Sequence, residues 1–171
     1  MLIRQLNIGD SEEIYCLIDS NRDYLGNWLS WVPDTQSRSD AEAFLLKSLD
    51  LARERKGYFC GIFVGDILVG VAGATAYPGE KNSMYLNYWV SNAWSRRGLA
   101  TQACRQLIHF LESKWCIDSF FVTLSDKNIA SLRVAEKLGF RFSEPLSNSD
   151  HNTDGFSANL LYKRLKESTY D

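Results

Sequence analysis

The stretch YWVSNAWSRRGLATQACRQLIHFLESKW, residues 88–115, decides the fold of this 171-residue chain. It begins with aromatic and β-branched residues, which are typical of a strand, and continues after a short polar stop into a long amphipathic segment. In that segment small and apolar residues recur at steps of three and four, which predicts one buried helix face: Ala100, Ala103, Cys104, Leu107, Ile108 and Leu111. Arg96, Arg97 and Gly98 lie where the strand gives way to the helix.

This hinge between strand and helix has the chemistry of an anion site. The first N–H groups of a helix have no partner inside the helix and carry a fractional positive charge. Gly98 lets a ligand approach the backbone closely, and two cations precede it. Such a row of amide donors suits a pyrophosphate. Taken alone, the same residues also fit a solvated turn, and the phosphate motifs of P-loop and Rossmann proteins are absent from the sequence.

Outward from the hinge, hydrophobic periods and turn residues predict the remaining elements. Strands are expected over 2–6, 58–64, 67–77, 83–90, 119–124 and 156–165. Helices are expected from Asp10 or Ser11, from near Ser39 to Gly57, after the hinge, and from Asn128 to a stop at Gly139. The order predicts an α/β (α+β) fold as a single domain over 1–171. Its sheet is mixed, mostly antiparallel, with about seven strands and helices on both faces.

The composition excludes several classes of protein. The net charge is −2 and the basic residues form no long stripe, so no nucleic-acid partner is expected. No apolar run approaches the roughly 18 residues that span a bilayer, and the first residues lack a signal-peptide pattern. We therefore expect a cytoplasmic protein without a membrane partner. Four separated cysteines and only two histidines predict buried reduced thiols and no metal site.

Three segments, in matching order, resemble the GNAT superfamily of acyl-CoA-dependent N-acyltransferases. SRRGLAT, residues 95–101, is similar to the family's phosphate loop, Gln/Arg-x-x-Gly-x-Gly/Ala, with Ser95 in place of the first Gln or Arg. DKNIASLRVAEKLGF, residues 126–140, is similar to the second signature, in which Asn-x-x-Ser/Ala opens a helix that ends in Gly-Phe. NRDYLGNWLSWV, residues 21–32, resembles the RimJ/RimL branch of ribosomal-protein N-terminal acetyltransferases.

The resemblance implies where acetyl-CoA, the cosubstrate, would bind. The strand before the phosphate loop is expected to splay from its parallel neighbour, and the pantetheine arm would pair with Trp89, Val90 and Ser91. The pyrophosphate would be held by Arg96, Arg97, Gly98, Leu99, Ala100 and Thr101. Asn128 would bond the pantetheine, act as a simple helix cap, or do both.

For catalysis, the resemblance implies that Ser131 contacts the cofactor and acts on the departing sulfur. Ala135 stands where many relatives have a tyrosine for this role, and Ser131 instead matches the serine that the RimJ/RimL branch uses. Tyr85 likewise stands where many relatives have a strand glutamate. In the RimJ/RimL branch a glutamate beyond Gly-Phe serves as the base, and the same count from Phe140 reaches Asp150, next to His151, either of which could take the proton directly or through water. A packing role for Ser131 and a simple polar loop around Asp150 remain the alternatives.

The resemblance also implies transfer of an acetyl group to a primary amine, first of all the α-amine of a protein N-terminus such as that of a ribosomal protein. An α-amine has a pKa of about 7.7–8 against about 10.4 for lysine, so a site without the strand carboxylate favours it. A small-molecule amine and a catalytically silent CoA-binding protein remain alternatives, and a homodimer is left open. The candidate acceptor residues are Arg22, Tyr24, Trp28, Trp31 and Tyr85, with aromatic core packing as the alternative.

Overall fold

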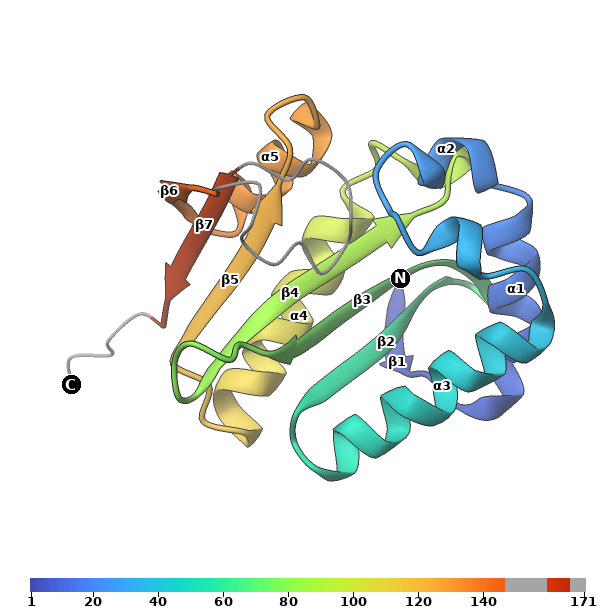
Figure 1. Cartoon of the computed structure of the whole chain (residues 1–171), viewed down its shortest axis with the longest axis horizontal. Helices are drawn as coiled ribbons and strands as arrows, with labels where there is room; N and C mark the ends of the chain where they lie inside the picture. Colours follow the sequence, from blue (N-terminus) through green and yellow to red (C-terminus); the bar gives the residue numbers. More distant parts are fainter. Residues whose placement is uncertain (147–159, 167–171) are drawn as a thin grey trace.

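The strand that precedes the hinge, β4 (Ser83–Val90), lies in the middle of a mixed sheet. The computed structural model describes residues 1–146 and 160–166, and within them the sheet has seven strands in the order β1-β2-β3-β4-β5-β7-β6. The other strands are β1 (Leu2–Gln5), β2 (Gly57–Val64), β3 (Ile67–Ala76), β5 (Ser119–Leu124), β6 (Arg141–Pro145) and β7 (Leu160–Leu165). Neighbouring strands pair antiparallel except β4 and β5, which are parallel, as the expected strand–helix–strand connection requires (Figure 1).

The parallel strands β4 and β5 separate along their length. Their register places Ser83–Tyr85 opposite Ser119–Phe121 and ends there. Toward their carboxyl ends the two strands diverge (Figure 1). The expected splayed parallel pair is therefore confirmed, and it opens a seam in the sheet beside the hinge.

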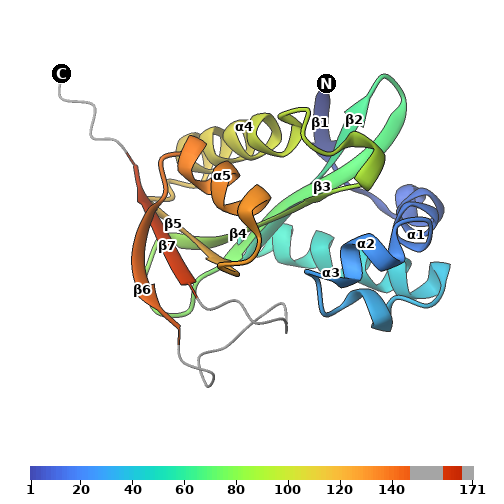
Figure 2. The same cartoon turned by 90° about the horizontal axis from the view of Figure 1, so that it is seen from above.

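Helices cover both faces of the sheet (Figure 2). On one face lie α1 (Ser11–Asp19), α2 (Arg22–Gly26) and α3 (Arg38–Arg53), and on the other lie α4 (Leu99–Lys114) and α5 (Ile129–Lys137). Each face has its own apolar cluster of buried side chains. The helix face expected to be buried in α4 is buried at five of its six residues: Ala103, Cys104, Leu107, Ile108 and Leu111. The sixth, Ala100 in the first turn, is only partly buried.

The caps of α1 and α3 are only partly as expected. Asp10 is the N-cap residue of α1, one of the two positions expected, but its side chain makes no capping hydrogen bond. Instead, the Asp10 carboxylate accepts hydrogen bonds from Arg4 at 2.7 and 2.8 Å and from the N–H of Asn7 at 2.8 Å. Helix α3 is capped by Ser37 rather than near Ser39, in a reciprocal capping box with Asp40.

The carboxyl-terminal part contains a strand that the sequence pattern did not predict. Strand β6 follows the turn at Gly139 and pairs with β7, so that β7 lies between β5 and β6. All residues of β6 are exposed, so it lacks the hydrophobic alternation by which strands are recognised. The strand expected over 156–165 is described from Leu160 onward.

The four cysteines divide into two kinds. Cys60 and Cys104 are buried as expected, and burial raises the pKa of the Cys60 thiol to about 12. The expected burial is wrong for Cys16 and Cys116, which are exposed free thiols. In the part of the chain that the structure describes, no helix combines the length and the apolar character needed to cross a membrane.

Candidate active site

A cleft of about 1740 Å³ lies where β4 and β5 separate. Its walls come from the carboxyl-terminal halves of both strands, the hinge and first turn of α4, the first turns of α5, and the segment from α2 to α3. The cleft therefore joins the two faces of the sheet through the seam. This geometry lets a ligand on the α4 side meet a second ligand on the α1–α3 side.

The amino end of α4 opens into this cleft without a side-chain cap. Gly98 is the N-cap residue, with a left-handed φ of 75°, a conformation that glycine adopts without strain. Arg96 is also left-handed, with a φ of 59°, which costs a non-glycine residue on the order of 1 kcal/mol. Arg96, Gly98, Leu99, Ala100 and Thr101 all line the cleft. The uncapped amides and the exposed Arg96 thus lie together in the cleft, and an anion site there stays a prediction.

Arg97 lies differently from its neighbours in the hinge. Its guanidinium sits over the ring of Trp94, 4.6 Å from the ring centre, and donates to the carbonyl of Ala93 at 3.2 Å. Arg97 is not among the residues that line the cleft. We infer that it stabilises the turn before α4 instead of contacting the anion site directly.

The backbone of β4 presents hydrogen-bonding groups to the seam at alternate residues. The N–H of Ser91 donates to Val69, and the N–H of Tyr77 donates to Ser83, so the odd-numbered residues of β4 bond to β3. The even-numbered residues therefore direct their N–H and C=O groups toward β5, where pairing ends at Tyr85. Of the three residues expected to pair with the pantetheine, Val90 faces the seam with its backbone, whereas Trp89 and Ser91 face β3. Trp89 and Val90 line the cleft, and the buried Ser91 does not.

The first turn of α5 forms the opposite wall of the seam. The Oδ1 atom of Asn128 accepts the N–H of Ser131 at 3.1 Å, so Asn128 is a helix cap as well as a cleft residue. The hydroxyl of Ser131 donates to the hydroxyl of Tyr88 at 3.0 Å, and Tyr88 donates to the carbonyl of Ser131 at 3.1 Å. Tyr88 is not among the residues predicted from the sequence, although its position on the splayed strand, one residue before Trp89, was the available signal.

The acceptor candidates Tyr24, Trp28 and Trp31 line the cleft on the α1–α3 side. Trp28 is exposed, at 36% of its accessible surface, and Trp31 packs against Trp89 at a centroid distance of 6.2 Å. Polar and aromatic side chains that the sequence analysis did not identify lie on the same wall: Phe44, Phe59, Asn87 and Thr123. This side of the cleft is therefore mainly aromatic with neutral polar groups at the seam.

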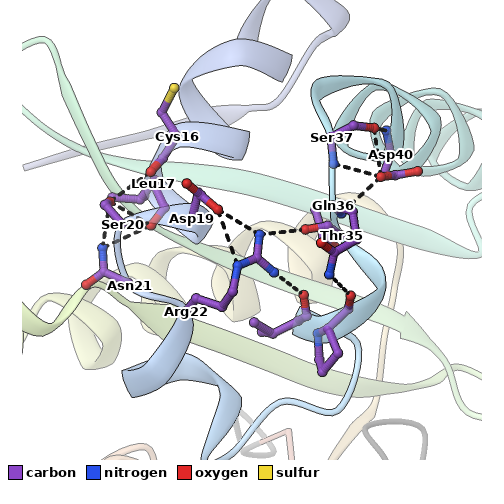
Figure 3. Close-up of polar contacts among 12 residues, drawn as sticks. Cys16, Leu17, Asp19, Ser20, Asn21, Arg22, Thr35, Gln36, Ser37 and Asp40 are labelled. Carbon is purple, nitrogen blue, oxygen red and sulfur yellow. Dashed lines mark hydrogen bonds and ion pairs between the residues drawn. The ribbon is translucent and has the colours of Figure 1, made fainter.

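Arg22 organises this wall but does not line it (Figure 3). Its guanidinium donates to the carbonyls of Val32 at 2.8 Å and Thr35 at 2.9 Å, and pairs with Asp19 at 2.9 Å. These bonds tie the beginning of α2 to the turn η2 (Val32–Asp34) that precedes α3. The placement argues for a structural role for Arg22 and against direct contact with an acceptor.

Three further sequence expectations concern acid–base groups. Tyr85 lies where β4 and β5 are still paired, packs against Tyr77 and Phe121, and is outside the cleft lining. Ala135 is fully buried in the core under α4, so this position offers no group to the seam. Asp150 lies outside the described residues.

The charges of the cleft are unevenly distributed. Four of the lining cations lie on the side of the hinge and α5, namely Arg96, Lys127, Arg133 and Lys137, and one, Lys47 of α3, lies on the acceptor side. On the acceptor side the carboxylates among the described lining residues are Asp34 and Asp40. Hydrogen bonds from Ser37 and Gln36 lower the pKa of Asp40, so that this group stays ionised. Within residues 1–146 and 160–166, no group of three or more His, Cys, Asp or Glu side chains is placed to hold a metal ion.

Comparison with known proteins connects this geometry to a family. Residues 1–141 match the family described as acetyltransferase (GNAT) domain. A curated protein of Bacillus subtilis strain 168, named "Putative ribosomal N-acetyltransferase YdaF", is 23% identical over 172 residues, which cover 99% of this chain and 92% of that protein.

Solved structures share the fold over almost the whole chain. One is RimL, a ribosomal L7/L12 α-N-protein acetyltransferase in complex with coenzyme A, with a TM-score of 0.85, 19% identity, and coverage of 95% of this chain and 92% of that chain. Another is the microcin C7 self-immunity acetyltransferase MccE in complex with acetyl-CoA and AMP, with a TM-score of 0.85, 20% identity, and coverage of 96% and 92%.

Proposed function

This chain belongs to the GNAT acetyltransferase family, and we propose that it transfers the acetyl group of acetyl-CoA to the N-terminal α-amine of a protein, of the kind found on ribosomal proteins. The relatives named above support this choice of acceptor, because one is a ribosomal N-acetyltransferase by name and another acetylates ribosomal L7/L12. Such an acceptor places the reaction in the cytoplasm.

The observation that supports this function most strongly is the seam itself. Strand pairing between β4 and β5 stops at Tyr85, next to an uncapped helix end at Gly98. In the proposed complex the pyrophosphate accepts hydrogen bonds from the amides of the first turn of α4, and the pantetheine lies between the strands. Val90 and Tyr88 supply the backbone groups that a pantetheine amide would need. The cations on the α5 side favour the phosphates of CoA electrostatically.

Acetyl transfer requires three things of the residues around the seam. The acceptor amine must be neutral when its nitrogen attacks the thioester carbonyl, the carbon–sulfur bond must break with its electron pair moving to sulfur, and the proton lost by the amine must reach a base or water. In this proposal Ser131 donates a hydrogen bond to the departing sulfur. Asp150 remains the candidate that removes the proton from the amine, directly or through water.

The polarity of the acceptor wall favours an α-amine over a lysine. The odd-numbered side chains of β4 that line this wall at the seam, Asn87 and Trp89, offer no carboxylate. The described carboxylates of the acceptor side, Asp34 and Asp40, lie in η2 and α3 and not on the strand. Keeping an amine neutral near pH 7 costs about 3 kcal/mol more for lysine than for an α-amine, given the difference in their ordinary pKa values. A site with little help for deprotonation is therefore better matched to the less basic amine.

A small amine that carries a nucleotide is the second candidate acceptor. MccE was solved with AMP as well as acetyl-CoA. In the present chain, Trp28 and Phe44 line the acceptor wall with 36% and 37% of their surfaces exposed, and such exposed rings can stack on a nucleobase. This acceptor would use the same acetyl-CoA site and the same chemistry.

The test measures thiol release from acetyl-CoA with a matched panel of acceptors. The panel pairs peptides that begin with a free Ser or Ala with the same peptides N-terminally blocked and bearing an internal lysine, and adds spermidine and an aminoacyl-adenosine analogue. The proposal predicts turnover with the free peptides, and mass spectrometry should place the acetyl group on the α-amine. Turnover only with small amines, or CoA binding without turnover on any acceptor, would contradict it.

A further inference from the structure

A pair of hydrogen bonds joins β4 to α5 across the open seam. Tyr88 lies three residues beyond the last parallel pair, and its side chain points toward the α4–α5 face. Its hydroxyl donates to the carbonyl of Ser131 at 3.1 Å and accepts from the hydroxyl of Ser131 at 3.0 Å. Both residues line the cleft. A side-chain link thus stands where the strand ladder has ended.

In this arrangement the hydroxyl proton of Ser131 is directed at Tyr88 and not at a ligand in the seam. A serine hydroxyl has one proton, so it cannot donate to Tyr88 and to a sulfur atom together. The phenol of Tyr88 can turn from the Ser131 carbonyl to the Ser131 Oγ atom, after which Ser131 is free to donate elsewhere. The carbonyl keeps an acceptor role in the helix, because a carbonyl oxygen has two lone pairs.

We propose that Tyr88 is a positioning residue for acetyl transfer. In the free enzyme it accepts the hydrogen bond of the Ser131 hydroxyl, and when acetyl-CoA occupies the seam it donates to the Ser131 Oγ atom and orients that hydroxyl toward the thioester sulfur. The inference rests on the proposed function. In the step itself the amine nitrogen bonds to the carbonyl carbon, the carbon–sulfur bond breaks, and sulfur leaves as a thiolate that accepts the Ser131 hydrogen bond. The amine proton goes to the base or water, and the thiolate takes its proton from water later. Tyr88 and Ser131 both keep their protons.

The surroundings of Tyr88 keep its hydroxyl protonated, so that it can always donate a hydrogen bond. Burial, with a smaller contribution from the neighbouring Cys104, raises the pKa of Tyr88 far above its ordinary value, while the hydrogen bond from Ser131 opposes this shift. The phenol therefore stays protonated throughout the working pH range. Position 135 of α5, where many relatives have a tyrosine, is a buried alanine in this chain. The phenol near the seam is therefore supplied by Tyr88 of β4.

A double-mutant cycle in steady-state kinetics tests the coupling. Tyr88→Phe removes the hydroxyl and keeps the ring, and Ser131→Ala removes its partner. Each single change should lower kcat about tenfold or more with the KM for acetyl-CoA within twofold, and the double variant should be no slower than the slower single variant, because the two groups act as a unit. Ser131→Thr, which retains a hydroxyl, should recover most of the rate. Independent, multiplicative losses in the double variant would overturn the proposal.

A binding measurement tests the same inference without turnover. Calorimetry at pH 9, where a larger fraction of the CoA thiol is ionised than at neutral pH, compares CoA with desulfo-CoA. The wild type should bind CoA several-fold more tightly, and Tyr88→Phe and Ser131→Ala should both lose that preference. If no amine is acetylated, the proposed function is wrong, but the ratio of the affinities for CoA and desulfo-CoA still tests the role of Tyr88. An unchanged ratio in Tyr88→Phe would overturn it.

The matched control is Tyr58→Phe. Tyr58 is a partly buried residue of β2 that packs against Phe110 and Trp115 in the same core cluster and lies outside the cleft lining. It undergoes the same chemical change, so kcat and the CoA preference should stay at wild-type values. A loss in this control equal to that in Tyr88→Phe would show a general packing effect and overturn the assignment.

Discussion

At the scale of single residues, Gly98 combines a left-handed backbone with a position at the mouth of the cleft. Its φ of 75° suits glycine, and its place at the uncapped start of α4 leaves the backbone open to a ligand. Gly98→Glu should therefore lower CoA affinity at least a hundredfold, because the new carboxylate would occupy the anion site and repel phosphate. Calorimetric titration with CoA measures this loss.

Gly65 provides the control for that substitution. It has a similar left-handed φ of 60° in the turn between β2 and β3, with no other atom near the position of an added Cβ. Gly65→Glu should cost about 1–2 kcal/mol of folding free energy from backbone strain, as Gly98→Glu should, but leave CoA affinity unchanged. Equal CoA affinities for the two variants would remove Gly98 from the phosphate site.

Sequence reasoning located residues whose role depends on the backbone better than residues whose role depends on a side-chain partner. Gly98 and Asn128 follow from local rules for helix ends, and the structure places both in the cleft. Arg22 and Arg97 were expected to contact ligands, but their guanidinium groups are bonded to nearby carbonyls. Tyr88 was missed because its partner lies 43 residues away in the chain.

At the scale of elements, the segment between α1 and α3 depends on Arg22. Its guanidinium satisfies two carbonyls and pairs with Asp19 (Figure 3). These bonds fix the backbone of the segment that carries the aromatic residues of the acceptor wall. Arg22→Ala should raise the KM for the acceptor peptide about fivefold or more and leave the affinity for acetyl-CoA within twofold.

Arg22→Lys should not restore the peptide KM, because an ammonium group cannot reproduce the planar fork of donors. Arg53→Ala, which removes an exposed arginine paired with Asp50 at the end of α3, should leave both constants unchanged. A parallel loss of acetyl-CoA affinity in Arg22→Ala would indicate global damage instead of a local effect on the acceptor wall.

The junction of β1 with α1 should respond to acid. The hydrogen bond from Arg4, then that from the N–H of Asn7, lowers the pKa of Asp10 below its ordinary value, against the opposing effect of burial. Because the folded-state pKa is the lower one, this stabilisation is present above the unfolded value of about 3.9 and is lost as the pH falls through the folded value. Asp10→Asn should cost about 1 kcal/mol at pH 7, a modest value since Arg4 is 40% exposed.

Urea unfolding at pH 7, 4 and 2.5 measures this effect. The difference between wild type and Asp10→Asn should shrink toward zero at the lowest pH. Asp50→Asn alters a surface pair whose side chains are 76% and 66% exposed, so it should change stability little at any pH. A difference for Asp10→Asn that stays constant with pH would exclude the ionised pair as its cause.

The elements with strong periodic patterns were predictable, and those set by tertiary contacts were not. Strand β4 matches its expected bounds, and the buried face of α4 follows from its spacing. Strand β6 has no apolar alternation and exists because β7 supplies a partner. The cap of α3 was placed two residues late because several serines offered alternatives and only the reciprocal bond with Asp40 distinguishes Ser37.

At the scale of the whole molecule, the two faces of the sheet line the cleft with different kinds of residue. Helices α4 and α5 cover one face and α1–α3 the other (Figure 2). The lining from the first face contains the start of α4, most of the cations and Ser131, and the lining from the second face is mainly aromatic. The cleft at the seam between β4 and β5 is lined from both faces, and in the proposed function a thioester on one side meets an amine from the other. The family resemblance predicted the splayed strand pair, whereas composition and periodicity alone indicated only the class of fold.

The most direct test of the central claim is a crystal structure of the protein with CoA. We predict that the pyrophosphate will lie within hydrogen-bonding distance of the backbone N–H groups at the start of α4, with the pantetheine between β4 and β5 and its sulfur near Ser131. CoA bound at another surface, with the seam filled by protein side chains, would contradict the account.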